Sequence, residues 1–307
     1  MLAGRMVEPS FTVVVPCFDG AAYLEAALRS ALDQTHPATE ILVIDDGSTD
    51  GSLEIARSLG PRVVSLSQPR QGPSAARNLG ADRAQGTFVA FLDADDLWLP
   101  DKLERQARVL RAAPEVGLVY TGLHRLYPDG SLVEVRARPP AWTIPRLTLE
   151  CPLLPSTVVV RTDLVREVRW SSQFGSSEDW DLFYRLSQRC RFGFVEESTT
   201  RYRQHAESLS SRDWRAVLEN ARRVSATIQR DQHGLAGERR RRMVEARLQA
   251  GAAIAARDAG SGEDLGHMLR SLATWPFPAP GRRRYRILAK MLLQHLTPAG
   301  RSPRRPR

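Results

Sequence analysis

The chain has 307 residues, of which 42% are hydrophobic and 26% charged, which is ordinary globular usage and enough for a sizeable core. No apolar run approaches the roughly 20 residues of a membrane-spanning helix, and residues 1–10 lack the apolar segment of a signal peptide, so we expect a cytoplasmic chain. Cys17, Cys151 and Cys190 are odd in number and widely spaced, which favours reduced thiols over a disulfide framework or a CxxC metal site.

The net charge of +9 is unevenly distributed. Residues 1–200 carry 21 basic and 26 acidic side chains, whereas residues 201–307 carry 23 basic and 9 acidic ones. This asymmetry predicts an acidic body and a basic segment with a partner preference of its own. We expect the body at 10–210, a basic helical extension at 211–298 and a disordered basic tail at 299–307.

The first hundred residues alternate between strand and helix patterns. Apolar, β-branched runs predict strands covered on both faces at 11–17, 40–44, 62–66 and 87–92. Helical spacing and helix-start signals predict helices at 21–32, at 52–59 and from 73 onward. This alternation predicts an α/β fold with a mostly parallel, Rossmann-like central sheet flanked by helices, followed by a helical C-terminal extension.

The pattern loosens from about residue 115. We expect further strands at 116–122, 131–135, 156–161, 191–197 and 199–205. The proline-rich segment 139–156 predicts a loop, and 176–189 predicts a helix with Ser176 or Ser177 as its N-cap. Helices are expected beyond Arg212.

Two acidic clusters fall at the carboxyl ends of predicted strands, where ligands bind in parallel sheets. The first is Asp45 and Asp46, and the second is Asp93, Asp95 and Asp96. A divalent cation would remove the repulsion within the second cluster, because Mg²⁺ or Mn²⁺ takes one or two carboxylates plus substrate phosphates. Taken alone, this segment also fits a solvated turn that caps the next helix.

Four motifs occur in order: "VVVPCFDGAAYLEAALRSALDQT", "EILVIDDGSTDGS", "QGPSAARNLGADRAQGTFVAFLDADDLWLPDKL" and "SSEDWDLFYRL". Together they resemble the family 2 glycosyltransferases, inverting enzymes of the GT-A fold, over residues 10–210. The resemblance implies transfer of a sugar from a nucleotide-sugar donor, with UDP favoured, to a hydroxyl of a glycan or lipid-linked acceptor, dependent on Mn²⁺ or Mg²⁺.

Two alternatives stay open. A nucleotidyltransferase has a similar sheet but normally needs a Gly-rich phosphate loop after the first strand, where this chain has only Gly20. A non-catalytic module that binds sugar nucleotides or membranes could use the same scaffold, although all the expected carboxylates are present.

For the nucleotide, the resemblance implies that Pro16, Phe18 and Asp19 pack against the base. Phe18 could stack on a pyrimidine or belong to the core. Asp46 would accept a hydrogen bond from the base, and a carboxylate can accept from a uracil N3–H. Asp45 is expected to brace the loop.

For the diphosphate and the cation, the resemblance implies four more residues. Arg77 and Asn78, on an early helical turn, suit a diphosphate, with an exposed arginine paired along its helix as the alternative. Asp93 would bind the ribose or the metal, and Asp95 the cation. His205 would lie near the metal or phosphates, or be structural.

The general base is expected at the start of the helix within 176–189. We favour Asp179, with Glu178 binding the acceptor or in reserve, because a carboxylate there can take a proton from the acceptor hydroxyl. Ordinary acidic charge at a helix start is the alternative. Trp180 would be core or a platform for an acceptor sugar, and Asp96 would support the site or face the acceptor.

The C-terminal segment holds basic runs at 239–242 and 281–296, the second with an apolar face. A basic amphipathic helix suits an anionic bilayer surface, so peripheral contact with the inner face of the membrane is one expectation. A helical bundle with a solvated arginine face is the other. No nucleic-acid partner is expected, since no motif supports one.

Overall fold

In the computed structural model the chain divides into two compact units, Met1–Ser208 and Leu209–Arg307. The described residues are 8–205, 208, 213–230, 234–258, 261 and 263–275. The segments 281–296 and 299–307, for which an amphipathic helix and a disordered tail are predicted, lie outside them.

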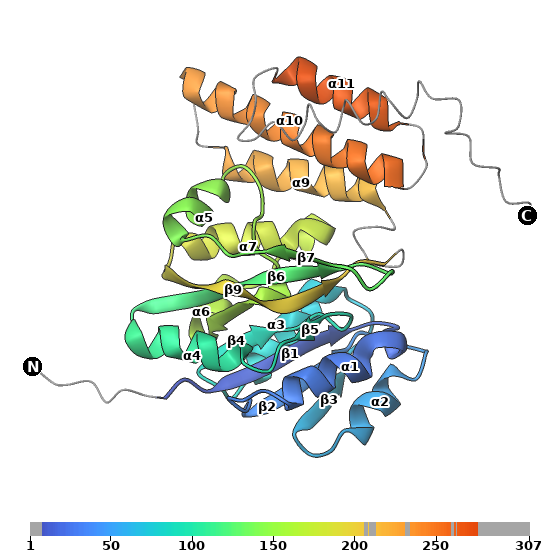
Figure 1. Ribbon diagram of the computed structural model, residues 1–307, viewed down its shortest axis with the longest axis vertical. Coiled ribbons are helices and arrows are strands. Elements are labelled where there is room, and N and C mark those ends of the chain that lie inside the picture. Colours follow the sequence, from blue (N-terminus) through green and yellow to red (C-terminus); the bar gives the residue numbers. More distant parts are fainter. Residues whose placement is uncertain are drawn as a thin grey trace, which may run out of the picture. The chain divides into compact units, whose positions relative to one another are not determined.

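A mixed sheet forms the centre of the first unit, in the order β3-β2-β1-β4-β8-β6-β9-β5, with β7 beside β6 (Figure 1). Its strands are β1 (Phe11–Cys17), β2 (Glu40–Asp45), β3 (Val63–Ser67), β4 (Phe88–Phe91), β5 (Leu97–Trp98), β6 (Val116–Leu126), β7 (Leu132–Val135), β8 (Val158–Arg161) and β9 (Arg191–Arg203). Strands β3, β2, β1 and β4 pair in parallel, and so do β6 and β9. The remaining pairings are antiparallel. The predicted α/β fold class is confirmed.

Helices cover both faces of this sheet, because β1, β2 and β4 are apolar on both sides. One face packs against α1 (Ala21–Leu32), α2 (Ser52–Ser58) and α4 (Lys102–Ala112), whose buried side chains share a core with Val13 and Val15. On the other face lie α3 (Pro73–Arg83), α6 (Thr162–Val168) and α7 (Glu178–Ser187). There the Trp170 ring packs edge-on between Phe91 of β4 and Phe183 of α7.

Two segments differ from the sequence-based expectation. A short helix, α5 (Pro140–Arg146), lies within the predicted loop 139–156. Proline at its first position is compatible with a helix start, and the helix buries Thr143. Strand β9 is continuous where two strands were predicted, because shifts in its register against β6 absorb the irregular stretch without ending the pairing.

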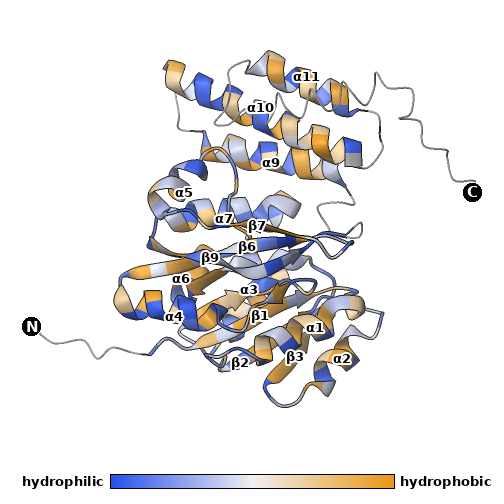
Figure 2. Ribbon diagram, in the orientation of Figure 1, coloured by the Kyte–Doolittle hydropathy of each residue, from blue (hydrophilic) through white to orange (hydrophobic). Residues whose placement is uncertain are grey.

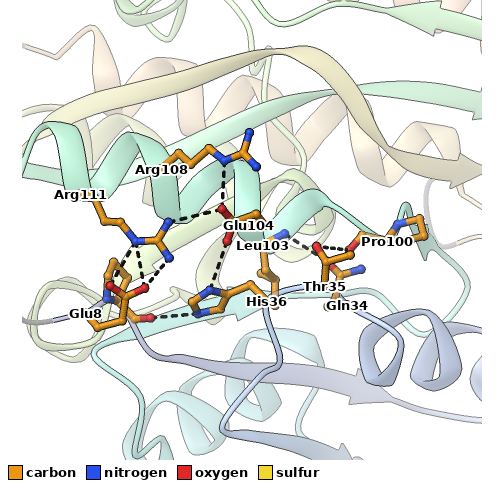
Figure 3. Close-up of polar contacts among 10 residues, drawn as sticks. Glu8, Gln34, Thr35, His36, Pro100, Leu103, Glu104, Arg108 and Arg111 are labelled. Carbon is orange, nitrogen blue, oxygen red and sulfur yellow. Dashed lines mark hydrogen bonds and ion pairs between the residues drawn. The ribbon is translucent and has the colours of Figure 1, made fainter.

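Polar contacts fix the segment that follows Asp93, Asp95 and Asp96. Gln34, after α1, accepts from the Leu103 amide and donates to the Leu99 carbonyl. Farther along α4, Glu104 pairs with Arg108, Arg111 and His36 (Figure 3). The start of α4 is therefore held against α1 and the loop that follows it.

The second unit consists, within the described part, of α9 (Trp214–Ile228), α10 (Gly234–Asp258) and α11 (Asp264–Thr274). Apolar and polar residues alternate along these helices, as in an amphipathic bundle (Figure 2). Small residues of α10 pack against Trp214 and Met268. Among the described helices, none is long and apolar enough to cross a membrane.

We predict that Gly80→Ala destabilises the first unit by about 1–3 kcal/mol, because overpacking a tight core costs this much. A Cβ at Gly80 of α3 would lie 2.3 Å from Cγ1 of Val14, a fully buried residue of β1. Urea unfolding followed by circular dichroism measures the loss. Arg83→Ala, at an exposed position of the same helix, is the control and should change the free energy of unfolding by no more than about 0.5 kcal/mol. Equal stability of the two variants would contradict the prediction.

Candidate active site

Two loops meet at the carboxyl ends of β1 and β2. The Asp19 amide donates to Ser48 Oγ at 3.0 Å, and the Thr49 amide donates to Asp19 Oδ1 at 2.9 Å. Asp19 adopts a positive φ of 47°, which is uncommon outside glycine. As predicted, Asp45 braces its loop, accepting from the Ser48 amide at 3.0 Å. These contacts hold the two loops together.

Asp50 caps both helices that leave these loops. Its Oδ2 accepts from the amide of Ala21, the first residue of α1, at 2.8 Å. Its Oδ1 accepts from the amide of Ser52, the first residue of α2, at 3.1 Å. One carboxylate therefore satisfies a main-chain amide at the start of each helix.

Asp46, predicted to bind the nucleobase, is buried beneath the loop that precedes α3. Its Oδ1 accepts from the Gln71 amide at 2.8 Å and from Gln68 Nε2 at 2.7 Å. Its Oδ2 accepts from the amide of Gly72 at 2.8 Å, and Gly72 has a φ of +88°. One carboxylate thus fixes the path of this loop.

Phe18 lies half-buried at the end of β1, next to the half-buried Pro16. The Arg70 guanidinium stands 3.8 Å above the centre of the Phe18 ring. Phe18 is therefore a surface of the site rather than part of the closed core. Arg70 was not identified from the sequence, where it is one arginine among many.

Arg77 joins the two halves of the site. Its Nη2 donates to Asp93 Oδ1 at 2.7 Å and its Nη1 donates to Glu178 Oε1 at 2.9 Å. The side chain is only 6% exposed, which excludes the predicted alternative of an exposed surface arginine. Burial alone would lower the pKa of Arg77, but the two carboxylates raise it above its usual value, so the guanidinium stays charged. Contact with a diphosphate stays a prediction.

Asn78, also predicted to bind the nucleotide, makes two hydrogen bonds with the main chain of Trp170. Its Nδ2 donates to the Trp170 carbonyl and its Oδ1 accepts from the Trp170 amide, each at 2.9 Å. The ring of Trp170 lies 4.5 Å from the Arg77 guanidinium. Asn78 therefore holds the segment that packs against Arg77.

The acids after β4 occupy three different environments. Asp93, at the Arg77 ion pair, donates its amide to Ser156 Oγ at 3.0 Å. Asp95 Oδ2 lies 2.8 Å from His205 Nε2, and burial together with the charge of Asp93 raises the pKa of Asp95. Asp96 is fully buried and accepts from the Arg203 amide at 3.0 Å. Burial, then the charges of Asp95 and Asp93, raise the pKa of Asp96 well above its usual value.

Ser156 is a supporting residue that the sequence did not reveal. It lies in a short 3₁₀ turn, Pro155–Thr157, and is fully buried. Its carbonyl accepts from Trp98 Nε1 at 2.8 Å and from Thr200 Oγ1 at 3.1 Å, while its hydroxyl holds the Asp93 amide. A single serine before a strand carries no local signal of this role.

Glu178 and Asp179 begin α7. Glu178 is buried, which raises its pKa, while Arg77 acts in the opposite direction. Asp179 accepts from the Trp180 amide at 2.7 Å, and burial together with the charge of Glu178 raises the pKa of Asp179 to about 7. Trp180 is 3% exposed and donates Nε1 to the Leu147 carbonyl at 2.7 Å, so it belongs to the core rather than to an acceptor platform.

Within the described residues, no group of three or more His, Cys, Asp or Glu side chains is arranged to hold a metal ion. Asp95 and His205 nevertheless present an oxygen and a nitrogen to each other at 2.8 Å. This pair suits a cation that takes its remaining ligands from substrate phosphates and water.

We predict that Arg77→Met destabilises the first unit by about 3 kcal/mol, because it leaves two carboxylates without their shared cation. Glu178 is 7% exposed and Asp93 25%, so water relieves part of the cost at Asp93. Chemical unfolding measures the loss, and the double variant Arg77→Met/Glu178→Gln should recover part of it. Arg29→Ala, which breaks an exposed pair with Glu25, is the control and should cost less than about 1 kcal/mol. An Arg77→Met protein as stable as this control would refute the prediction.

Comparison with known proteins places this geometry in a family. Residues 12–150 match the family described as Glycosyl transferase family 2. The putative teichuronic acid biosynthesis glycosyltransferase TuaG of Bacillus subtilis (strain 168) is 36% identical over 128 residues, covering 40% of this chain and 50% of TuaG. The uncharacterized glycosyltransferase RC0461 of Rickettsia conorii is 30% identical over 200 residues, covering 64% of this chain. The chain spans about a third of that relative's length.

Solved structures share the fold at low sequence identity. Residues 1–349 of S. aureus TarS superpose with a TM-score of 0.60 at 19% identity, covering 87% of this chain and 81% of TarS. The mannosyltransferase PcManGT of Pyrobaculum calidifontis, in complex with GDP-Man and Mn²⁺, gives a TM-score of 0.58 at 20% identity, covering 96% of this chain and 82% of PcManGT. The motifs and the matched segment therefore make residues 12–150 similar to the family 2 glycosyltransferases, and the first unit shares the GT-A fold of these structures.

Proposed function

We propose that the chain is an inverting, metal-dependent enzyme that moves a sugar from a nucleotide-sugar donor to a hydroxyl of a glycan or lipid-linked acceptor. The observation that carries this is the Arg77 bridge, which sets Asp93 on the donor side beside Glu178 and Asp179. A UDP-sugar is the favoured donor, since TarS structures contain UDP and UDP-GlcNAc, although PcManGT contains GDP-Man.

Donor binding is assigned to the joined loops after β1 and β2. Phe18 offers a ring face to the base once Arg70 moves aside, and Asp46 keeps the neighbouring loop in place. Pro16 and Asp19 complete this side. Asp93 faces the ribose or the cation, in line with its partly exposed position.

Asp95 and His205 would hold Mn²⁺ or Mg²⁺. When bound, such a cation neutralises the negative charge that develops on the departing diphosphate. The raised pKa of Asp95 fits this role, because a nearby cation would favour the ionised carboxylate.

Asp179 is assigned as the general base. A carboxylate with a pKa of about 7 is matched to proton transfer at neutral pH. It takes the proton of the acceptor hydroxyl as that oxygen bonds to C1 of the sugar. The bond between C1 and the diphosphate oxygen breaks on the opposite side, so the configuration at C1 inverts. Glu178, held by Arg77, positions Asp179 and raises its pKa.

The basic second unit suits an acceptor carried on an anionic bilayer surface. Of the arginine run in α10, Arg241 and Arg242 pair with Glu238, and Arg239 lies 5.4 Å from the ring of Trp275. TuaG is named as a putative teichuronic acid biosynthesis glycosyltransferase, which is compatible with a glycan acceptor here.

Two substitutions test the roles of the carboxylates. Asp179→Asn should lower UDP release from UDP-sugars with Mn²⁺ at least about 100-fold, the usual scale for a proton-transfer residue. Asp95→Asn should also lower it, because it removes a proposed ligand of the cation that stabilises the departing diphosphate. Only Asp95→Asn should also reduce the rise in melting temperature caused by UDP with Mn²⁺, because a ligand stabilises in proportion to its binding. Asp33→Asn, at an exposed position after α1, is the control for both assays. Wild-type release rates in either site variant would disprove that residue's role.

The pH dependence of donor turnover tests the base separately. Since the ionised form of Asp179 acts, kcat/KM should fall as the pH drops through about 7 and level off above it. Glu178→Gln removes a charge that raises the pKa of Asp179, so the midpoint should move to lower pH. A midpoint that is the same in both proteins would contradict the assigned coupling.

A further inference from the structure

Helix α5 is fastened to the first unit along one side. The Tyr120 hydroxyl donates to the Arg138 carbonyl at 2.5 Å and contacts Thr143 Oγ1 at 2.9 Å. Leu147, just after the helix, is fully buried, and its carbonyl accepts from Trp180 Nε1. The helix is therefore held on the core and presents its opposite side at a fixed position.

Trp142 lies on the side of α5 that these anchors leave open. It is 42% exposed, whereas Trp98, Trp170, Trp180 and Trp214 are each 3–6% exposed. The guanidinium of Arg146 stands 3.9 Å over the Trp142 ring, on one of its faces. An amphipathic aromatic ring held in the open on an anchored helix is suited to contact with a ligand.

Arg146 also pairs with Glu150, with Nη1 to Oε1 at 2.6 Å. The Arg146 side chain is 18% exposed and that of Glu150 is 38% exposed. The ion pair has no net charge, yet it sets hydrogen-bond donors and carboxylate acceptors next to an indole. This combination matches a sugar ring, which has an apolar C–H face and adjacent hydroxyls that both donate and accept.

This group lies on a segment that is bonded to the start of α7. The Leu147 carbonyl is bonded by Trp180, the residue after Asp179, and Trp142 lies about 8 Å from Leu147 along a helix that rises about 1.5 Å per residue. Cys151 follows Glu150 in the chain. Burial, and then the charge of Asp179, raise the pKa of the Cys151 thiol, so this end of the segment lies within the electrostatic reach of Asp179.

We propose that Trp142, Arg146 and Glu150 form a binding site for a neutral pyranose ring of the acceptor. The apolar C–H face of the sugar packs against the exposed edge of the Trp142 indole, beside the ion pair, where Arg146 can donate to and Glu150 can accept from its hydroxyls. The assignment to the acceptor rests on the proposed function, in which the donor binds at the loops after β1 and β2.

Fluorine NMR of the full chain labelled with 5-fluorotryptophan tests binding directly. Cellotetraose and chitotetraose are the probes, sorbitol is the matched acyclic polyol, and Trp142→Phe identifies the Trp142 signal. Titration with either tetrasaccharide at millimolar concentration should shift that signal and saturate, and sorbitol should not. No shift with either sugar, or an equal shift with sorbitol, would overturn the proposal.

Glu150→Gln should weaken binding of the tetrasaccharide about tenfold, which corresponds to about 1.4 kcal/mol. Tyr127→Ala removes another exposed aromatic of the same unit, 36% exposed, and should leave the affinity unchanged. The rise in melting temperature caused by UDP with Mn²⁺ is also measured. It should be equal in the wild-type protein and in Trp142→Ala. If UDP gives no shift in wild type, the proposed function fails while the sugar titration still stands. If UDP binds and the sugars do not, this site alone is refuted.

Discussion

One buried guanidinium organises the active site. Arg77 is charged, nearly inaccessible to water and bonded to carboxylates from two elements that lie 85 residues apart in the chain, Asp93 after β4 and Glu178 at the start of α7. A charge in such a place is costly unless it is paired, and so are the carboxylates. The guanidinium therefore permits the acids to share one region, and its two ion pairs fix the distance between Asp93 and Glu178.

The ion pair between Arg77 and Glu178 also affects the pKa of Asp179. Glu178 is kept in place by Arg77, and the charge of Glu178 raises the pKa of its neighbour. Burial contributes most to the shift, so the same packing near α7 also raises the pKa of Asp179, the proposed base. Local sequence supports this arrangement: Gly80 lets α3 lie close to β1, and Asn78 holds the main chain of Trp170 against Arg77.

The sequence predicted the parts of the fold that have a local cause. The β-branched runs gave the strands, and the acidic turns at 45–46 and 93–96 were correctly placed at strand ends. Contacts between distant segments could not be predicted, because no local pattern encodes them. The sequence placed Arg77 and Asn78 on one helical turn but could not show that the first turns toward carboxylates and the second toward the Trp170 main chain. Ser156 was missed for the same reason, and the sequence could not decide between the core and platform roles considered for Trp180.

The two sides of the site differ in how they are held, which bears on how its specificity can change. Around the loops proposed to bind the donor, carboxylates are bonded to main-chain amides: Asp46 to the loop before α3 and Asp50 to two helix starts. A substitution there disturbs the backbone as well as the ligand. Helix α5 is held instead by Tyr120, Thr143 and Leu147, and its open side chains carry no part of that support. Residues at positions 142, 146 and 150 can therefore change while the loops after β1 and β2, which are proposed to bind the donor, keep their geometry.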